Sequence, residues 1–312
     1  MLVSTERPVS SQPVLTTTVA REFVHRAAFA EVFLTGWRET GQDAFTVTAQ
    51  WPRSHSFYSS EHGVYDPMLL AETIRQTFPL LAHAAYQIPF GYQLSWSNFQ
   101  FTLNPQAMLI ERTPADIEVR VRCSDIRYQR GLPASMSMHH EILRAGTPIA
   151  VASTRFGCHS PRVYERLRAG RANIAEVFAG APTPPPPAAC TEVGRTRSQD
   201  VVLSPTAEAG QWQLRLDTDH PVLFDHAVDH APGMLLLEAV RQASTAVDAG
   251  PAPAVLTALD IEFHRYVEFG SPCWIAAEAV PPVSAGARSR TLVTARQDGA
   301  AVFTASGDIT PL

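Results

Sequence analysis

A nine-residue pattern occurs twice in the chain, and this duplication constrains the fold more than any other feature. Residues 68–76 and 234–242 both read Met-Leu-Leu-x-Glu-x-x-Arg-Gln, and their glutamates are 166 residues apart. The similarity continues after the pattern, because residues 94–101 correspond to residues 256–263 at a slightly shorter offset. A repeat of about half the chain indicates a duplicated domain rather than a solenoid of short repeats.

Each copy of the pattern predicts a buried helix that contains one acid. Pro67 and Pro232 precede the apolar runs, and proline is common in the first turn of a helix. Burial of a lone carboxylate is unfavourable unless it is paired or protonated, and Arg241 lies three residues after Glu238. We expect burial to raise the pKa of Glu72 and Glu238, so that both can act as general bases near neutral pH.

Strand-like segments surround each predicted helix, which indicates an α+β fold. In the first half they cover residues 32–37, 44–51, 92–103, 117–124, 136–143 and 147–156. In the second half they cover residues 200–203, 212–216, 255–263, 273–280, 289–297 and 301–309. The first helix should end or kink near Phe78, because Pro79 follows. A long helix wrapped by an antiparallel sheet is the hotdog arrangement, so the repeat predicts a double hotdog, a pseudo-dimer in one chain.

Composition suggests the domain boundaries. Residues 1–22 are rich in Ser, Thr and Pro and read as a tail, and residues 23–160 form the first hotdog domain. Residues 161–198 contain an amphipathic helix, predicted to reach about residue 178, followed by a proline-rich stretch that is typical of a stiff linker. Residues 199–312 form the second hotdog domain.

Charge and cysteine usage exclude several functional classes. All 25 basic residues are arginine, which excludes a Schiff-base lysine and a P-loop lysine. A net charge of −5 without a basic run argues against nucleic acid as a partner. No signal peptide or membrane-spanning run is evident, and the four widely spaced cysteines suggest a reducing, cytoplasmic environment.

The loop before the second helix is dense in polar residues. His226, Asp229 and His230 have a His-x-x-Asp-His spacing that could hold zinc, although loop histidines more often bond backbone carbonyls. We predict no metal and no cofactor.

Residues 224–242, together with Val24-His25-Arg26 and Glu72-Thr73-Ile74-Arg75-Gln76, resemble the A-factor biosynthesis (AfsA-type) hotdog family of actinomycetes. Residues 232–239 also resemble a segment of 3-hydroxyacyl-ACP dehydratases, in which a helix acid works with a loop histidine. The first resemblance implies synthesis of γ-butyrolactone-type signalling molecules. A 3-oxoacyl group moves from acyl carrier protein (ACP) to the hydroxyl of dihydroxyacetone phosphate, and the ester then cyclises to a butenolide phosphate.

The resemblance and the residue chemistry together predict a site. Glu238, Glu72 and Gly233 are predicted to be catalytic, and His220, His226 and His230 compete for the role of a dehydratase-type histidine. The predicted substrate-binding residues are Arg241, Arg75, His226, His230, Gln242 and Gln76. Arginine can bind the phosphate bidentately.

We expect thioester cleavage beside Glu238. Gly233 offers a backbone N–H for an oxyanion at the helix N-terminus, whereas Pro67 has none and Asp66 would oppose the charge.

Three other functions remain open. Water as the acceptor would make the protein a thioesterase, and loss of water from a 3-hydroxyacyl chain would make it a dehydratase. A non-catalytic regulator that binds a lactone or acyl group is the alternative from another class. A homodimer of pseudo-dimers is also possible.

Overall fold

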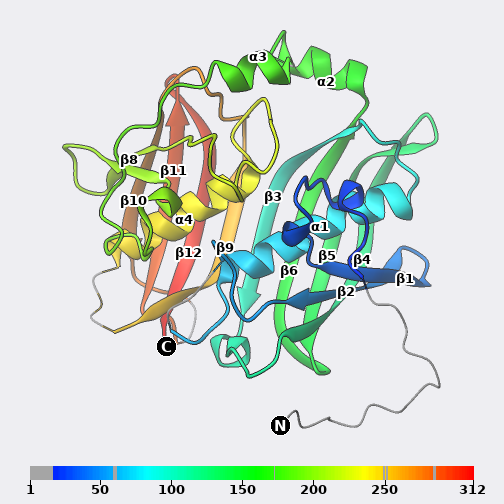
Figure 1. Cartoon of the computed structure of the whole chain (residues 1–312), viewed down its shortest axis with the longest axis horizontal. Coiled ribbons are helices and arrows are strands. Elements are labelled where there is room, and N and C mark those ends of the chain that lie inside the picture. Colours follow the sequence, from blue (N-terminus) through cyan, green and yellow to red (C-terminus); the bar gives the residue numbers. More distant parts are fainter. Residues whose placement is uncertain (1–16, 59–61, 172, 249, 251, 284–285) are drawn as a thin grey trace.

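The structure is a computed structural model that describes residues 17–58, 62–171, 173–248, 250, 252–283 and 286–312. It consists of one large antiparallel sheet that carries two long helices, α1 (Pro67–Ala84) and α4 (Gly233–Val247), on the same face (Figure 1). Most of the predicted N-terminal tail, residues 1–16, lies outside the described residues.

The sheet is continuous through both halves of the chain. The first half contributes β1 (Leu34–Gly41), β2 (Ala44–Trp51), β3 (Gln93–Leu103), β4 (Ala115–Gln129), β5 (Leu132–Arg144) and β6 (Thr147–His159). The second half contributes β7 (Leu203–Pro205), β8 (Gln211–Leu214), β9 (Ala254–Phe263), β10 (Cys273–Val280), β11 (Ser289–Gln297) and β12 (Ala300–Pro311). Their spatial order is β1-β2-β4-β5-β6-β3-β9-β12-β11-β10-β8-β7. Read from its outer edge, the first half runs β1-β2-β4-β5-β6-β3 and the second half runs β7-β8-β10-β11-β12-β9, so the two halves have the same topology.

The halves join where β3 pairs with β9, from Asn98 opposite Glu262 to Thr102 opposite Ala258. The helices α1 and α4 also contact each other. This arrangement confirms the predicted double hotdog, and it excludes two separate domains connected only by the proline-rich segment.

The core lies between the helices and the sheet. Burial alternates along the central strands, as in β4, where Ile117, Val119 and Val121 are buried and their neighbours are more exposed. In α1, by contrast, residues around the whole circumference are buried, including Met68, Leu69 and Leu70. Both helices are therefore enclosed by the sheet and its flanking loops, which places their glutamates in the interior.

The structure excludes an end of the first helix at Phe78, and the predicted end of one other helix was wrong. Helix α1 continues through Pro79 to Ala84, because proline fixes φ near the helical value and the buried Phe78, Leu80 and Leu81 hold the segment in place. The helix predicted to reach residue 178 is divided into α2 (Pro161–Arg168) and α3 (Ile174–Ala179). The chain turns between them, where Ala169 and Gly170 both have positive φ.

The proline-rich segment packs against the second half instead of crossing open solvent. The Pro186 carbonyl accepts a hydrogen bond from Ser204 Oγ at 2.6 Å, and the Pro185 carbonyl accepts one from Arg215 Nε at 2.7 Å. At 200–203 the predicted strand is replaced by a short 3-10 helix, Ser198–Asp200, followed by β7.

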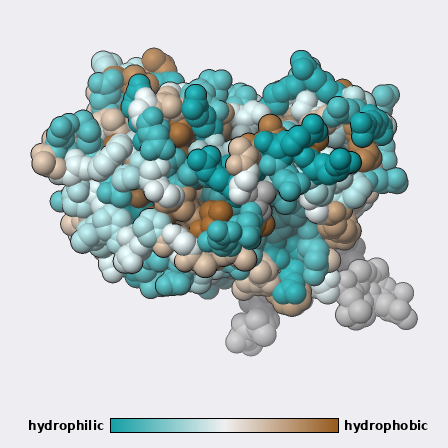
Figure 2. All heavy atoms as spheres, turned by 90° about the horizontal axis from the view of Figure 1, so that it is seen from above, coloured by the Kyte–Doolittle hydropathy of each residue, from teal (hydrophilic) through white to brown (hydrophobic). Residues whose placement is uncertain are grey.

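Seen from the end at which α2 and α3 lie, the surface is mostly hydrophilic, with small separate hydrophobic patches (Figure 2). Among the helices of the described part of the chain, none has the length and apolar character needed to cross a membrane. The four cysteines are free.

Candidate functional site

The acid of the first helix lies at the centre of a buried hydrogen-bond network. Glu72 Oε1 accepts hydrogen bonds from Arg26 Nε at 2.9 Å, Arg75 Nη2 at 2.8 Å and Gln76 Nε2 at 2.7 Å. Its Oε2 accepts from Arg75 Nε at 2.7 Å. The Arg26 guanidinium also crosses to the other half, where its Nη1 donates to the Val222 carbonyl at 3.0 Å.

The second helix repeats this network with different partners. Glu238 accepts hydrogen bonds from Arg195 Nε at 2.9 Å and Nη2 at 2.7 Å, and from Arg241 Nε at 2.9 Å and Nη2 at 2.8 Å. Arg195 Nη1 crosses in the opposite direction and donates to the Phe57 carbonyl at 2.8 Å. Arg26 and Arg195 therefore pair with their own helix acids and also connect the two halves.

These two arginines received no role in the sequence analysis. The sequence does contain a signal for them, since Val24-His25-Arg26 and Val193-Gly194-Arg195 repeat at an offset of 169 residues.

The expected direction of the glutamate pKa shift was wrong. Burial does raise the pKa of Glu72 and Glu238, but two guanidinium groups beside each carboxylate outweigh it and lower both pKa values from 4.5 to about 2. Both acids are charged at neutral pH, with each oxygen engaged in hydrogen bonds. A carboxylate in this state is a poor proton acceptor, so we revise both glutamates from general bases to residues that hold arginines.

The two glutamines of the repeated pattern are also fully engaged. Gln76 Nε2 donates to the Glu31 carbonyl at 2.6 Å, and its Oε1 accepts from the Phe33 N–H at 3.0 Å. Gln242 makes the equivalent bonds to the Asp200 carbonyl at 2.8 Å and the Val202 N–H at 3.0 Å. Both side chains are completely buried, so we revise their role from substrate binding to holding the preceding chain against the helix.

The N-termini of the two helices differ. In α1, Asp66 Oδ1 accepts from the Met68 N–H at 2.8 Å, and Arg195 Nη1 lies 3.2 Å from the other Asp66 oxygen. In α4, the N-cap residue Pro232 has no side-chain acceptor. Within the described residues, the backbone N–H groups of Gly233 and Met234 have no hydrogen-bond partner. Of α1 and α4, therefore, it is α4 that begins with free donors, as the sequence predicted.

These free donors border a cavity of about 530 Å³ between the two halves. Its wall includes Gly233 and Met234, Arg75 and Phe78 of α1, and residues 94–97 of β3. It also includes residues 263–267, which begin at the last residue of β9, and the histidines His25, His159, His226 and His230. The Trp96 ring packs directly over Gly233, where an added Cβ would lie 2.4 Å from the ring. Both halves thus contribute to one site at the start of α4.

Of the two predicted phosphate-binding arginines, Arg75 lines this cavity and Arg241 does not. Arg75 uses Nε and Nη2 to hold Glu72, and its side chain is 19% exposed. Arg241 holds Glu238 in the same way, but its Nη2 donates to the Val193 carbonyl at 3.1 Å, away from this cavity. The structure brings the first-half arginine, not the second-half one, to the open helix N-terminus.

Two Asp-His pairs face the cavity. His230 Nδ1 lies 2.7 Å from Asp229, which also accepts hydrogen bonds from Tyr164 at 2.8 Å and Arg168 at 2.8 Å. Burial raises the pKa of Asp229, but its bonds to His230 and Arg168 outweigh this and lower it to about 2. A charged carboxylate accepts, so His230 Nδ1 carries the proton and its Nε2 is the basic nitrogen.

His226 forms the second pair, with its Nδ1 2.5 Å from Asp225. Asp225 also accepts from the Ala27 N–H at 2.8 Å, and its pKa is lowered because the bond from His226 and the charge of Arg26 outweigh burial. Sequence reasoning found both histidines but not Tyr164 and Arg168, which come from α2 about 60 residues earlier.

His220, the third candidate histidine, has a structural role. Its Nδ1 accepts from the backbone N–H groups of Val222 at 3.2 Å and Leu223 at 3.0 Å. His55 makes the same bonds to Phe57 and Tyr58 in the first half, both at 3.1 Å. The repeated histidine shapes the loop before each helix, and neither copy lines the cavity.

His25 is a neutral imidazole in the cavity wall. Its pKa is lowered to about 3, first by burial and then by the neighbouring charge of Arg75. The Ile88 carbonyl accepts from His83 Nδ1 at 2.6 Å, and His83 Nε2 lies 2.8 Å from His25 Nε2. His83 therefore carries a proton on Nδ1.

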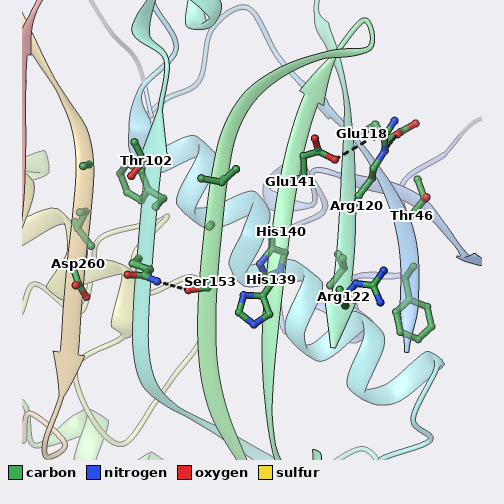
Figure 3. Close-up of a pocket in the computed structure, with 18 of the residues that line it drawn as sticks. Thr46, Thr102, Glu118, Arg120, Arg122, His139, His140, Glu141, Ser153 and Asp260 are labelled. Atoms are coloured by element: carbon green, nitrogen blue, oxygen red, sulfur yellow. Dashed lines mark hydrogen bonds and ion pairs between the residues drawn. The ribbon is translucent and has the colours of Figure 1, made fainter. Parts of the chain in front are cut away.

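A larger depression of about 1110 Å³ lies on the opposite face of the sheet, away from α1 (Figure 3). Neither helix glutamate and none of the loop histidines line it. Arg120 within it is already paired with Glu118 at 2.8 Å and Glu141 at 3.2 Å. We therefore assign the candidate site to the cavity at α4.

Comparisons with known proteins agree with this architecture. The family model for the A-factor biosynthesis hotdog domain matches residues 9–160 and 179–312. A Streptomyces virginiae protein named 2-oxo-3-(phosphooxy)propyl 3-oxoalkanoate synthase is 45% identical over 289 residues, which cover 93% of this chain and 96% of that protein. A Streptomyces griseus protein of the same name is 41% identical over 293 residues, which cover 91% and 93%.

Solved structures with low sequence identity share the fold. A putative oleoyl thioesterase from Lactobacillus plantarum superposes with a TM-score of 0.55 at 12% identity, covering 87% of this chain and 97% of that one. A 12:0-ACP thioesterase from Umbellularia californica gives 0.51 at 9% identity, covering 88% and 100%.

Proposed function

Because the chain belongs to the A-factor biosynthesis hotdog family, we propose that it catalyses the reaction after which its relatives are named. It is an acyltransferase that moves a 3-oxoacyl group from a thioester to the hydroxyl of dihydroxyacetone phosphate. The product is a 2-oxo-3-(phosphooxy)propyl 3-oxoalkanoate, the ester precursor of a butenolide. We propose ACP as the carrier of the thioester and the cytoplasm as the location, which the four free cysteines support.

One observation carries the proposal at the level of the site. A single cavity is lined by the open N-terminus of α4, by the Arg75 guanidinium and by two histidines that are each hydrogen-bonded to an aspartate. Acyl transfer to a phosphorylated alcohol needs three functions: donors for a carbonyl oxygen, a base for a hydroxyl and a cation for a phosphate. The cavity contains a group for each.

The backbone N–H groups of Gly233 and Met234 are suited to the carbonyl oxygen of the acyl group. As the acceptor attacks, negative charge develops on this oxygen, and the helix N-terminus stabilises it. Removal of one such donor typically costs about 10²- to 10³-fold in rate. The apolar surfaces of Phe78, Trp96 and Phe156 line the same cavity and suit the acyl chain.

His230 is the proposed base for the acceptor hydroxyl. Asp229 holds its Nδ1 proton, so Nε2 can accept the hydroxyl proton during the attack and return it to the leaving group. Glu72 supports the site indirectly, because it positions the Arg75 guanidinium that we propose binds the phosphate.

The test is to incubate the protein with a 3-oxooctanoyl N-acetylcysteamine thioester, with and without dihydroxyacetone phosphate, and to identify products by mass. We expect the phosphorylated ester or its cyclised product only when both substrates are present. Free 3-oxo acid formed equally well without the acceptor would indicate a thioesterase. Dehydration of a 3-hydroxyacyl thioester would indicate a dehydratase, and binding without turnover would indicate a regulator.

The same assay tests the carrier. A 3-oxooctanoyl-ACP donor should give a lower KM than the N-acetylcysteamine thioester, because the carrier protein adds contacts outside the cavity. An equal KM for the two donors would contradict the proposal that ACP is the partner.

A further inference from the structure

The cavity also contains a serine-histidine pair that the reaction described above does not use. Ser95 Oγ lies 2.6 Å from His159 Nε2, and both side chains line the cavity. Ser95 is on β3 and His159 is the last residue of the adjacent strand β6. Ser95 is opposite Gly157, and His159 is two residues further along β6. The two side chains therefore lie diagonally on the same face of the sheet.

Gly157 makes this close approach possible. A Cβ at this position would lie 2.9 Å from His159 Nε2 and 3.0 Å from Ser95 Oγ, so any other residue would push the pair apart. Gly157 does not have the positive φ that favours glycine, so the glycine is required here for space rather than for its backbone conformation.

The surroundings suit a hydroxyl nucleophile. Burial lowers the pKa of His159, which keeps the imidazole neutral and able to accept a proton. Tyr266 lines the same cavity, and its ring lies 4.6 Å from that of His230. Within the described residues, no carboxylate contacts His159, so the pair is a dyad without an acid.

We propose that Ser95 is a nucleophile, activated by His159, that carries the acyl group as an ester between the thioester donor and the phosphorylated acceptor. This proposal rests on the proposed function and adds a covalent intermediate to it. It also gives His159 a role, since each half of a two-step transfer needs its own proton acceptor.

In the first step, His159 Nε2 takes the proton of Ser95 Oγ while the oxygen attacks the thioester carbonyl. The C–S bond breaks, the departing thiolate takes the proton from His159, and an acyl-serine ester remains. In the second step, His230 Nε2 takes the proton of the acceptor hydroxyl as that oxygen attacks the ester. The C–O bond to Ser95 breaks, and the proton that His230 took passes to the departing Ser95 oxygen, so both histidines and Ser95 return to their starting states.

The first experiment uses the full chain and the 3-oxooctanoyl N-acetylcysteamine thioester without acceptor. Thiol release should show a burst of about one equivalent per protein chain. The intact mass of the protein should rise by the mass of the acyl group minus that of one hydrogen. Peptide mapping should locate the acyl group on Ser95. Addition of dihydroxyacetone phosphate should remove the acyl group and give the phosphorylated ester.

Variants separate the chemical role from a structural one. Ser95→Ala should abolish the burst and the mass increase, and His159→Gln should slow acylation by about 10²- to 10⁴-fold. Gly157→Ala should slow it by about 10²-fold through displacement of the pair, while Ser95→Cys should still accept the acyl group. Ser97→Ala is the matched control, because Ser97 lines the same cavity and makes no hydrogen bond to a histidine in the described part of the chain.

The outcomes distinguish this inference from the proposed function. Wild-type protein that forms the phosphorylated ester without an acyl-enzyme, together with a Ser95→Ala variant that transfers at the wild-type rate, would overturn the dyad and leave the acyltransferase intact. Wild-type protein that acylates Ser95 but passes the group only to water would support the dyad and overturn the proposed acceptor.

Discussion

Arg195 holds Glu238 through two parallel hydrogen bonds of 2.9 and 2.7 Å in the interior of the protein. The same guanidinium contacts the first half at the Phe57 carbonyl, and Arg26 makes the reverse connection from Glu72 to Val222. The acids that looked like catalytic bases in the sequence are therefore part of two crossed ion-pair networks. These networks fix the helices, the preceding loops and the relative position of the two halves.

Replacement of Arg195 by methionine should destabilise the protein by about 3–5 kcal/mol, because Glu238 would keep a buried charge without its main partner. Urea unfolding measures this change. Arg120→Met is the control, since Arg120 is 54% exposed in its pair with Glu118 and its loss should have a much smaller effect on stability. Equal effects for the two variants would contradict the role assigned to Arg195.

Acid should destabilise the protein in two stages. Burial lowers the folded-state pKa of His25 and of His140 from 6.5 to about 3. Their contribution to the free energy of unfolding is therefore complete above pH 6.5 and is lost as the pH falls towards 3. The folded-state pKa of Glu72 and of Glu238 is lowered from 4.5 to about 2. Their contribution to the free energy of unfolding is therefore complete above pH 4.5 and is lost between pH 4.5 and pH 2.

Urea midpoints measured from pH 7.5 to 5 isolate the histidine stage. His140→Gln should make the pH dependence shallower by up to about 1.4 kcal/mol per pH unit, because His140 is fully buried against Thr77. His139→Gln, on the exposed face of the same strand (Figure 3), controls for the loss of an imidazole. Stability that stays constant or rises as the pH falls would refute the first stage.

Arg75 and Arg241, the two arginines of the repeated pattern, should differ in function although each holds its own helix glutamate in the same way. Arg75→Gln should raise the KM for dihydroxyacetone phosphate by about 10-fold or more, since a desolvated contact to phosphate is lost, and should leave the KM for the thioester nearly unchanged. Arg241→Gln removes the equivalent bond to Glu238 outside the cavity and serves as the matched control. Steady-state kinetics with each substrate varied in turn decide this, and equal shifts for both variants would assign Arg75 to the fold alone.

His230 and Glu238 should separate activity from stability. His230→Gln should lower kcat by about 10²- to 10⁴-fold with little change in Tm, because its side chain is 29% exposed in the cavity wall. Glu238→Gln should lower Tm, because it leaves Arg241 without its buried counter-charge and leaves Arg195 with Asp66 alone. A His230→Gln protein that keeps wild-type kcat would show that this histidine is not the base.

Local patterns in the sequence were sufficient for much of this structure. The repeated Met-Leu-Leu-x-Glu-x-x-Arg-Gln segments predicted two buried helices, and the alternating runs predicted most strands of the sheet. Gly233 after Pro232 predicted an open helix N-terminus, and the structure has one. These features depend on neighbours within a turn or a strand, so the order of residues determines them.

Only the tertiary structure decided how the parts combine. The charge state of Glu72 and Glu238 depends on Arg26 and Arg195, which lie 46 and 43 residues away in the chain, and their charges outweigh the burial that the sequence did predict. The pairing of β3 with β9 brings Arg75 of one half to the helix start of the other. Electrostatic energy depends on distances of a few ångströms in space, and a linear pattern contains no such distances between residues that are far apart in the chain.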